Sequence, residues 1–144
     1  MSTKRNNSSV SPPRLALVVH PDMRVVSELQ SALSNCGFTA IVARDLPTAL
    51  LAITQHYFEI ALVSAHLHET GDGWPLAGVL HLVFPRAFVG VLAAHEPDIL
   101  TLQSAINYGV REVYQQSTPA QEVVASIMAQ MEPGDRGSQP SSVQ

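Results

Sequence analysis

The sequence predicts an α/β fold in which one parallel, five-stranded sheet is covered by helices on both faces. Short apolar runs alternate with segments of helical periodicity from Leu15 onward, which is the pattern of repeated βα units. Three of the runs are continuously apolar, as expected of strands that are buried on both faces. The chain has 144 residues, of which 46% are hydrophobic, enough for one ordinary core.

Five apolar runs are predicted to form the strands: LALVV (15–19), TAIVA (39–43), IALV (60–63), AFVGVLA (87–93) and EVYQ (112–115). The first, third and fourth runs are the most continuously apolar and should lie in the centre of the sheet. The second and fifth are more polar or shorter and suit the edges. With right-handed crossovers, this gives a doubly wound sheet of strand order 2-1-3-4-5.

The clearest predicted helix follows Asp22 and ends at Gly37. Its apolar residues recur at steps of three and four, which places on one inward stripe Val25, Val26, Leu29, Ala32, Leu33 and Cys36. Asp45 is expected to cap a second helix with Pro47 in its first turn. The side chains that should point inward from this helix are Leu46, Ala49, Leu50 and Ile53.

Three further helices follow the third, fourth and fifth strands. Asp72 is expected to cap the third, which should bury Trp74, Ala77 and Leu80, with Val83 as a further candidate. The fourth begins near Pro97, ends before Gly109, and should bury Leu100, Ala105 and Ile106. The last begins near Thr118 and Pro119 and should bury Val123, Val124, Ile127 and Met131.

Composition excludes several classes of function. The formal net charge is −4 and the basic residues are scattered, so we expect no nucleic-acid partner. No apolar run approaches the roughly 20 residues of a membrane span, and with Cys36 as the one cysteine no intrachain disulfide can form. We expect a cytoplasmic protein with a folded domain at 14–131 between disordered tails at 1–13 and 132–144.

Four groups of residues, in order along the chain, carry a resemblance to a known family. They are VVHPD followed by a helix ending in CGF, EIALVSAHL followed by GDG, VGVLAAHE, and NYGVREVYQQS. In this spacing the chain resembles the receiver domain of two-component response regulators, which is a CheY-like, flavodoxin-like fold. The resemblance covers about residues 15–131 and implies a role in signalling through a protein partner.

The same alignment replaces the residues that carry the family's chemistry. The acidic pair that holds Mg²⁺ falls on His20 and Pro21, with Asp22 one place beyond, and the phospho-accepting aspartate falls on Ser64. The hydroxyl residue that binds the phosphoryl group falls on Ala93, the lysine on Gln116, and the proline that follows it on Ser117.

Without these groups we expect no aspartyl phosphorylation and no enzymatic activity, so the chain is predicted to be a pseudo-receiver. The aromatic residue that reports phosphorylation in the family falls on Val113. Tyr114 is adjacent but should point to the opposite face of the strand, because side chains alternate.

Two alternatives remain open at the same edge of the sheet. Histidines follow three central strands and offer candidate ligands for Zn²⁺ or a similar metal: His20, His66, His68 and His95. Ser64 with His20 as base and Asp22 as orienting acid is a remote hydrolase candidate, although no Gly-x-Ser-x-Gly elbow surrounds Ser64. The leading prediction includes no metal and no cofactor.

The remaining candidate is a surface. Receivers contact partners mainly through the fourth helix, fifth strand and fifth helix, which here span 99–108, 111–115 and 120–130. Exposed apolar or aromatic area on this face often marks an interface. The residues that we expect to contribute are Ile99, Leu102, Tyr108, Arg111 and Tyr114, either to a homodimer or to docking of a signalling or effector protein.

Overall fold

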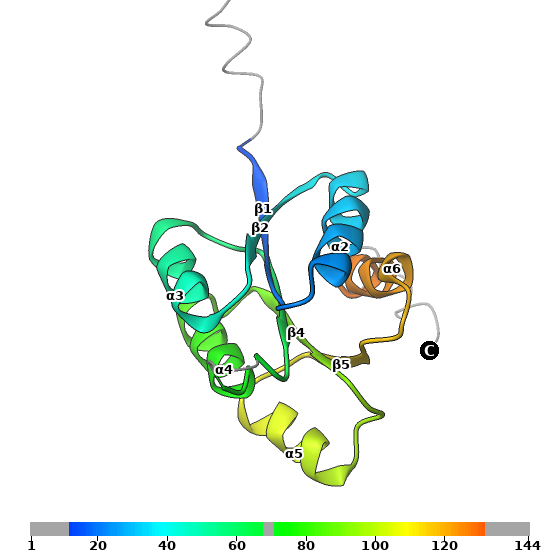
Figure 1. Ribbon diagram of the computed structural model, residues 1–144. Helices are drawn as coiled ribbons and strands as arrows, with labels where there is room; N and C mark the ends of the chain where they lie inside the picture. Colours follow the sequence, from blue (N-terminus) through cyan, green and yellow to red (C-terminus); the bar gives the residue numbers. More distant parts are fainter. Residues whose placement is uncertain (1–11, 68–70, 132–144) are drawn as a thin grey trace, which may run out of the picture.

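The computed structural model describes residues 12–67 and 71–131 and contains one parallel five-stranded sheet in the order β2-β1-β3-β4-β5 (Figure 1). The strands are β1 (Arg14–Val19), β2 (Phe38–Ala43), β3 (Ile60–Ser64), β4 (Phe88–Ala93) and β5 (Glu112–Gln115). The helices are α2 (Met23–Asn35), α3 (Leu46–Gln55), α4 (Trp74–Val83), α5 (Ile99–Asn107) and α6 (Ala120–Gln130). The predicted fold class, strand order and edge strands are confirmed.

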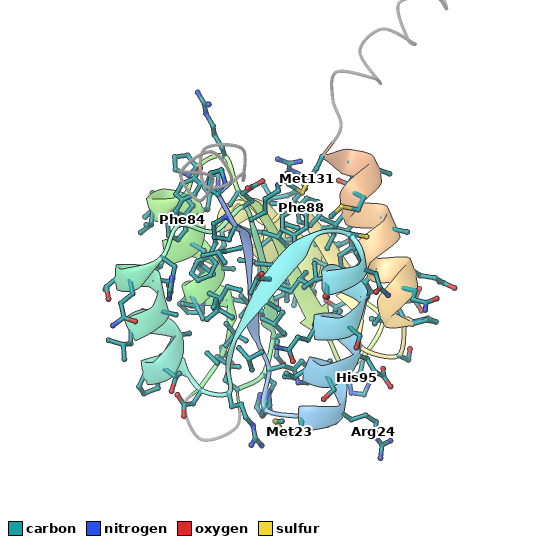
Figure 2. All side chains as sticks on the ribbon, turned by 90° about the horizontal axis from the view of Figure 1, so that it is seen from above. Met23, Arg24, Phe84, Phe88, His95 and Met131 are labelled. Carbon is teal, nitrogen blue, oxygen red and sulfur yellow. The ribbon has the colours of Figure 1, made fainter. Side chains whose placement is uncertain are left out.

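Side-chain alternation along the strands divides the core into two halves. Leu17 and Val19 of β1 pack with α3 and α4, whereas Ala16 and Val18 pack with α2 and α6. Phe84 belongs to the first half and Phe88 to the second (Figure 2). The sheet is therefore covered on both faces, which explains why its central strands are continuously apolar.

Aspartates begin three of the helices. The carboxylates of Asp22, Asp45 and Asp98 accept hydrogen bonds from backbone N–H groups of the first turn, at distances of 2.8 to 2.9 Å. The cap at Asp45 is confirmed, and α2 begins after Asp22 as expected, with Asp22 itself as its cap. The cap at Asp98 places the start of α5 just after the predicted Pro97. The predicted cap of α4 is wrong: Gly73 occupies the N-cap position, without a side-chain bond.

Several residues predicted to be buried are exposed: Cys36, Leu50, Val83, Leu100 and Ile106. Cys36 lies beyond the last turn of α2 as its C-cap, where the inward stripe has ended. In α3, Ala52 is buried in place of Leu50. The helix α5 buries only Ala105, because it lies at the margin of the sheet beside α4 and β5 rather than over the sheet (Figure 1).

Three predicted features lie wholly or mostly outside the described residues: His68 and the two tails, of which only residues 12 and 13 are described. Within the described ranges, no helix is both long and apolar enough to cross a membrane.

Candidate functional site at the carboxyl edge of the sheet

A cavity of about 260 Å³ lies at the carboxyl ends of β1, β3 and β4. It is lined by His20, Pro21, Asp22, Ser64, His66, Leu92, Ala94 and Gln116. Five of the six residues predicted for the altered phosphorylation pocket are therefore brought together. Ala93, the sixth, is buried at the end of β4, and its two neighbours line the cavity in its place.

His20 is buried directly after β1, with 2% of its surface exposed. Its backbone N–H donates to the carbonyl of Ala43 at the end of β2, at 3.0 Å. Its Nδ1 atom accepts a hydrogen bond from the backbone N–H of Asp22 at 3.0 Å, so Nδ1 carries no proton in this arrangement. The imidazole thus helps to shape the turn that leads into α2.

Asp22 turns its carboxylate to the start of α2 and accepts from the N–H of Arg24 at 2.9 Å. Among the described residues that line the cavity, it alone carries a formal charge. Because its oxygen is already used as a helix cap, this carboxylate is a poor substitute for a pair of acidic metal ligands.

Ser64 ends β3 and is 3% exposed. Its hydroxyl donates to the carbonyl of His66 at 2.8 Å and accepts from the N–H of the same residue at 3.3 Å. The side chain therefore closes a local turn over the two residues that follow it. In this geometry the hydroxyl proton is directed to a carbonyl oxygen, which cannot act as the base that a serine nucleophile requires.

The segment Gly71-Asp72-Gly73 brings the start of α4 against the end of β3. The N–H of Gly73 donates to the carbonyl of Ala65 at 3.0 Å, and a bridge pairs Asp72 with His66. A Cβ atom on Gly73 would overlap the carbonyl oxygen of Ser64, so only glycine permits this close approach. The sequence pattern indicated the turn, but nothing in it distinguished a steric role for Gly73 from a capping role for Asp72.

Gln116 forms the far wall of the cavity, just beyond β5. Its backbone N–H donates to the carbonyl of Ala93 at 2.7 Å, which continues the β4–β5 ladder past the last strand residue. The residue at the family's lysine position is thus held at the cavity, with a neutral amide where a cation would be needed.

Tyr114 lies on β5 opposite Leu92 and points to the α2–α6 side of the sheet, where its hydroxyl is 2.9 Å from Ser126 Oγ. Burial raises the pKa of its phenol above the ordinary value. The predicted orientation is confirmed, and Val113, which pairs with Val91, faces the other side of the sheet. The expectation that Tyr114 adds exposed aromatic area is wrong, because it is 9% exposed.

The histidines do not all meet. His20 and His66 line the cavity, whereas His95 is exposed after β4 and does not belong to the lining. Across residues 12–67 and 71–131, no three His, Cys, Asp or Glu side chains are placed to hold a metal ion.

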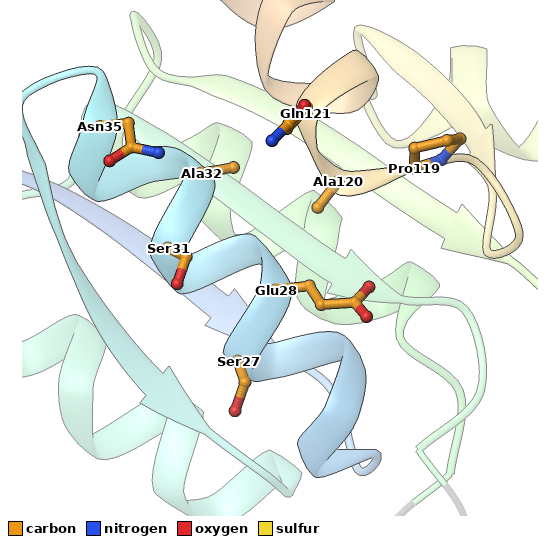
Figure 3. Close-up of a pocket in the computed structure, with 8 residues that line it drawn as sticks. All are labelled: Ser27, Glu28, Ser31, Ala32, Asn35, Pro119, Ala120 and Gln121. Atoms are coloured by element: carbon orange, nitrogen blue, oxygen red, sulfur yellow. The ribbon is translucent and has the colours of Figure 1, made fainter.

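A larger cavity of about 430 Å³ lies away from this edge, between α2 and the start of α6 (Figure 3). Ala32 on α2 and Ala120 at the start of α6 line it from its two sides, and the remaining lining includes polar side chains and Glu28. It has no buried polar group directed into it and is a groove between two helices. The smaller cavity, at the switch point between β1 and β3, is the better candidate for a functional site.

Comparison with known proteins yields structural neighbours only. No protein-family model and no curated protein matches the chain. A CheY-like receiver domain from Methanospirillum hungatei JF-1 has a TM-score of 0.77 at 15% identity, covering 88% of this chain and 99% of that one. A receiver domain of an HD domain-containing protein from Pseudomonas fluorescens Pf-5 has a TM-score of 0.71 at 24% identity, with coverage of 82% and 94%.

A third neighbour is a response regulator from Burkholderia pseudomallei, solved with a phosphorylated aspartic acid, a calcium ion and citrate. It has a TM-score of 0.70 at 20% identity and covers 84% of this chain and 74% of that one. At these identities the similarity establishes the receiver fold of the chain.

Proposed function

We propose that the chain is an atypical receiver of two-component-type signalling that acts through protein contacts and is not phosphorylated. The observation that carries this proposal is the state of Ser64, whose hydroxyl is bound into a turn with His66 at the edge where a receiver would be modified. The retained frame supports a receiver-like role, and the replaced side chains argue against the usual input.

The chemical argument rests on what phosphoryl transfer to a receiver needs. It requires a carboxylate nucleophile, a divalent cation that bridges the developing charge, and cationic or hydroxyl donors on the phosphoryl oxygens. The described lining of the cavity offers one carboxylate, on Asp22, which caps α2, and the neutral amide of Gln116. The Ser64 hydroxyl at the end of β3 donates its proton to the carbonyl of His66 and not to a base that could ionise it.

The test is an amide NMR titration of the full chain with beryllofluoride and Mg²⁺, a mimic of the phosphorylated state. We expect the spectrum to remain unchanged, as it should with acetyl phosphate and Mg²⁺. Saturable shifts of the amides around Ser64 that require Mg²⁺ would overturn the proposal.

The output of such a domain requires a surface, and we assign it to α5, β5 and α6. On α5 an apolar stripe at spacing i, i+3 and i+7 is formed by Ile99, Leu102 and Ile106, of which the first and last are 75% and 77% exposed. Tyr108 adds partly exposed aromatic area at the helix end, and Arg111 lies over the ring of Phe88 at 5.4 Å. We call this the output face and infer that a signalling or effector protein docks on it.

A second candidate function is favoured by one observation: His20 and His66 line the same cavity as Ser64 and Gln116. These groups could bind a small polar ligand or a metal and bias the same output face. Zn²⁺ titration of the wild-type chain, compared with the variant that combines His66→Ala and His68→Ala, tests this candidate. Absence of binding at micromolar Zn²⁺ would exclude the metal version.

The proposed functional unit is the domain at 14–131, acting in the cytoplasm. Both halves of the core are built from residues within this range.

A further inference from the structure

The exposed apolar side chains of the described residues are concentrated on three of the five helices. Of the twelve large hydrophobic residues that are exposed in the described part of the chain, eleven belong to α3, α4 or α5 or lie within two residues of their ends. The twelfth is Met23, at the start of α2. Single apolar residues scattered over a surface need no explanation, but such a concentration on three helices does.

The same three helices carry no charged side chain. Neither α3, α4 nor α5 contains an aspartate, glutamate, lysine or arginine, although the charges elsewhere give the chain a net charge of −4. We define the uncharged face as the exposed apolar residues of α3 and α4, together with Tyr57 two residues beyond α3: Leu50, Leu51, Tyr57, Val79, Leu82 and Val83. The output-face stripe of α5 is not part of it.

The two helices of the uncharged face form one layer. Both α3 and α4 pack on the same side of the sheet (Figure 1), and the rings of Tyr57 and Phe84 meet edge to face at 5.3 Å, which ties their ends together. Exposed apolar side chains on two helices of one layer are typical of an interaction site.

A hollow and a projection lie next to each other on this face. A cavity of about 310 Å³ between α4 and the end of α5 is lined by Val79 and Leu82 and floored by Gly78, against which the ring of Tyr108 lies. Leu82, at its rim, is 79% exposed and is the most exposed large hydrophobic residue described. An isologous contact needs such a pairing, because each copy must offer both the side chain and the recess that receives it.

Charge favours a second copy over other occupants. Two chains with a net charge of −4 repel one another, and this repulsion is smallest where the facing surfaces carry no charge. A charged partner would gain no ion pair here. Helices that lie on a membrane usually carry lysine or arginine along their polar flank, and α3 and α4 have neither.

We propose that the chain forms a two-fold symmetric homodimer through the uncharged face, with Leu82 of each copy entering the recess between α4 and α5 of the other. This goes beyond the proposed function, because it places self-association on α3 and α4, which meet the output face only at Tyr108, in the lining of the recess. The dimer leaves the stripe of Ile99, Leu102 and Ile106 free for a protein partner.

The test is sedimentation equilibrium of the full chain from about 5 to about 200 µM, a range that detects micromolar association. The expected mass rises toward twice 15.5 kDa. Leu82→Glu should weaken the dimer by about 100-fold, because the change occurs twice in a symmetric interface. Leu51→Glu, on α3, is a second variant with the same expectation.

The matched control is Ile106→Glu, which makes the same chemical change at an equally exposed position of the output face and should leave the dimer intact. Raising NaCl from about 0.05 to about 0.5 M should strengthen the dimer or leave it unchanged, since salt screens the repulsion between copies. A monomer throughout the range, a dimer insensitive to Leu82→Glu, or one that Ile106→Glu dissolves would each overturn the proposal. A monomer that instead sediments with neutral phosphatidylcholine vesicles would assign the face to a membrane.

Discussion

Ser64 is held by two hydrogen bonds to the backbone of His66, and their contribution to the free energy of unfolding can be measured. Ser64→Ala removes both bonds at a buried position and should lower the free energy of unfolding by about 1 kcal/mol. Urea denaturation measures this change. Ser31→Ala, at an exposed position of α2, is the matched control and should leave stability unchanged or raise it by up to about 0.5 kcal/mol.

A carboxylate at the same position should be worse tolerated. Ser64→Asp places an anion beside the carbonyl oxygen of His66 in a nearly buried site, and we expect a loss of about 2 kcal/mol. Equal stability of Ser64→Ala and the wild type would contradict a structural role for the hydroxyl.

Tyr114 gives a prediction about pH. Burial, with the nearby charge of Glu112, raises the pKa of its phenol above the ordinary value of 10.0, against the opposing effect of the bond to Ser126. The folded state therefore holds this proton more tightly than the unfolded state. The resulting stabilisation is complete below pH 10 and is lost as the pH rises through the folded-state pKa.

Absorbance at 295 nm during an alkaline titration measures the ionisation directly. The wild-type titration should contain a late component from Tyr114, and Tyr114→Phe should remove it. If the late component persists in the variant, another tyrosine carries it.

The location of a single residue could be predicted from the sequence where its position along a strand decides its environment. His20, Ser64 and Gln116 follow or end strands of one sheet, so the pattern placed them at one edge, and they line one cavity. Cys36 was predicted buried because helical periodicity continues through it, whereas α2 ends one residue earlier. Periodicity alone does not show where a helix stops.

At the scale of elements, the junction between α5 and β5 depends on Gly109. This residue has φ +73°, and a Cβ atom on it would overlap the imidazole of His81 on α4. Gly109→Ala should cost about 2 kcal/mol, of which about 1 kcal/mol reflects the left-handed backbone and the rest displacement of the imidazole.

Gly37, at the end of α2, is the matched control. It has φ +90°, but a Cβ atom there meets nothing within 4 Å, so Gly37→Ala should cost only about 1 kcal/mol. When His81→Ala is already present, the stability cost of Gly109→Ala should fall to the same value, about 1 kcal/mol. Urea denaturation of the four variants separates backbone strain from the α4–α5 contact, and equal costs for the two glycines would contradict that contact.

The type and order of the helices and strands could be predicted from the sequence, but the side chains that α5 buries could not. The alternation of apolar runs with periodic segments is a local signal, and all ten elements lie where it indicated. Leu100 and Ile106 fit a helical stripe equally well whether that stripe meets a sheet or solvent. Only the packing of α5 at the sheet margin, which leaves Ala105 as its one buried residue, decides between these outcomes.

At the scale of the whole molecule, the chain has the fold of a receiver but different side chains at the edge where a receiver is modified. The strand order brings four chain segments to one edge, and the fold matches one solved CheY-like receiver domain at 15% identity with a TM-score of 0.77. The sequence predicts which side chains lie at that edge, but it does not predict the hydrogen bonds between them. The turn between Ser64 and His66 and the close approach of Gly73 depend on a loop path that no periodic pattern specifies.

If the backbone at this edge keeps receiver geometry and only the side chains differ, restoring those side chains should restore phosphoryl binding. A variant that combines His20→Asp, Pro21→Asp, Ser64→Asp, Ala93→Thr and Gln116→Lys supplies the metal ligands, nucleophile and donors that phosphoryl transfer requires. We expect it to show saturable, Mg²⁺-dependent amide shifts with beryllofluoride, whereas Ser64→Asp alone shows none because it has neither metal site nor lysine. The matched control carries the other four substitutions and leaves Ser64 in place. A folded five-substitution variant that still gives no response would show that the backbone at this edge, and not only its side chains, has departed from receiver geometry.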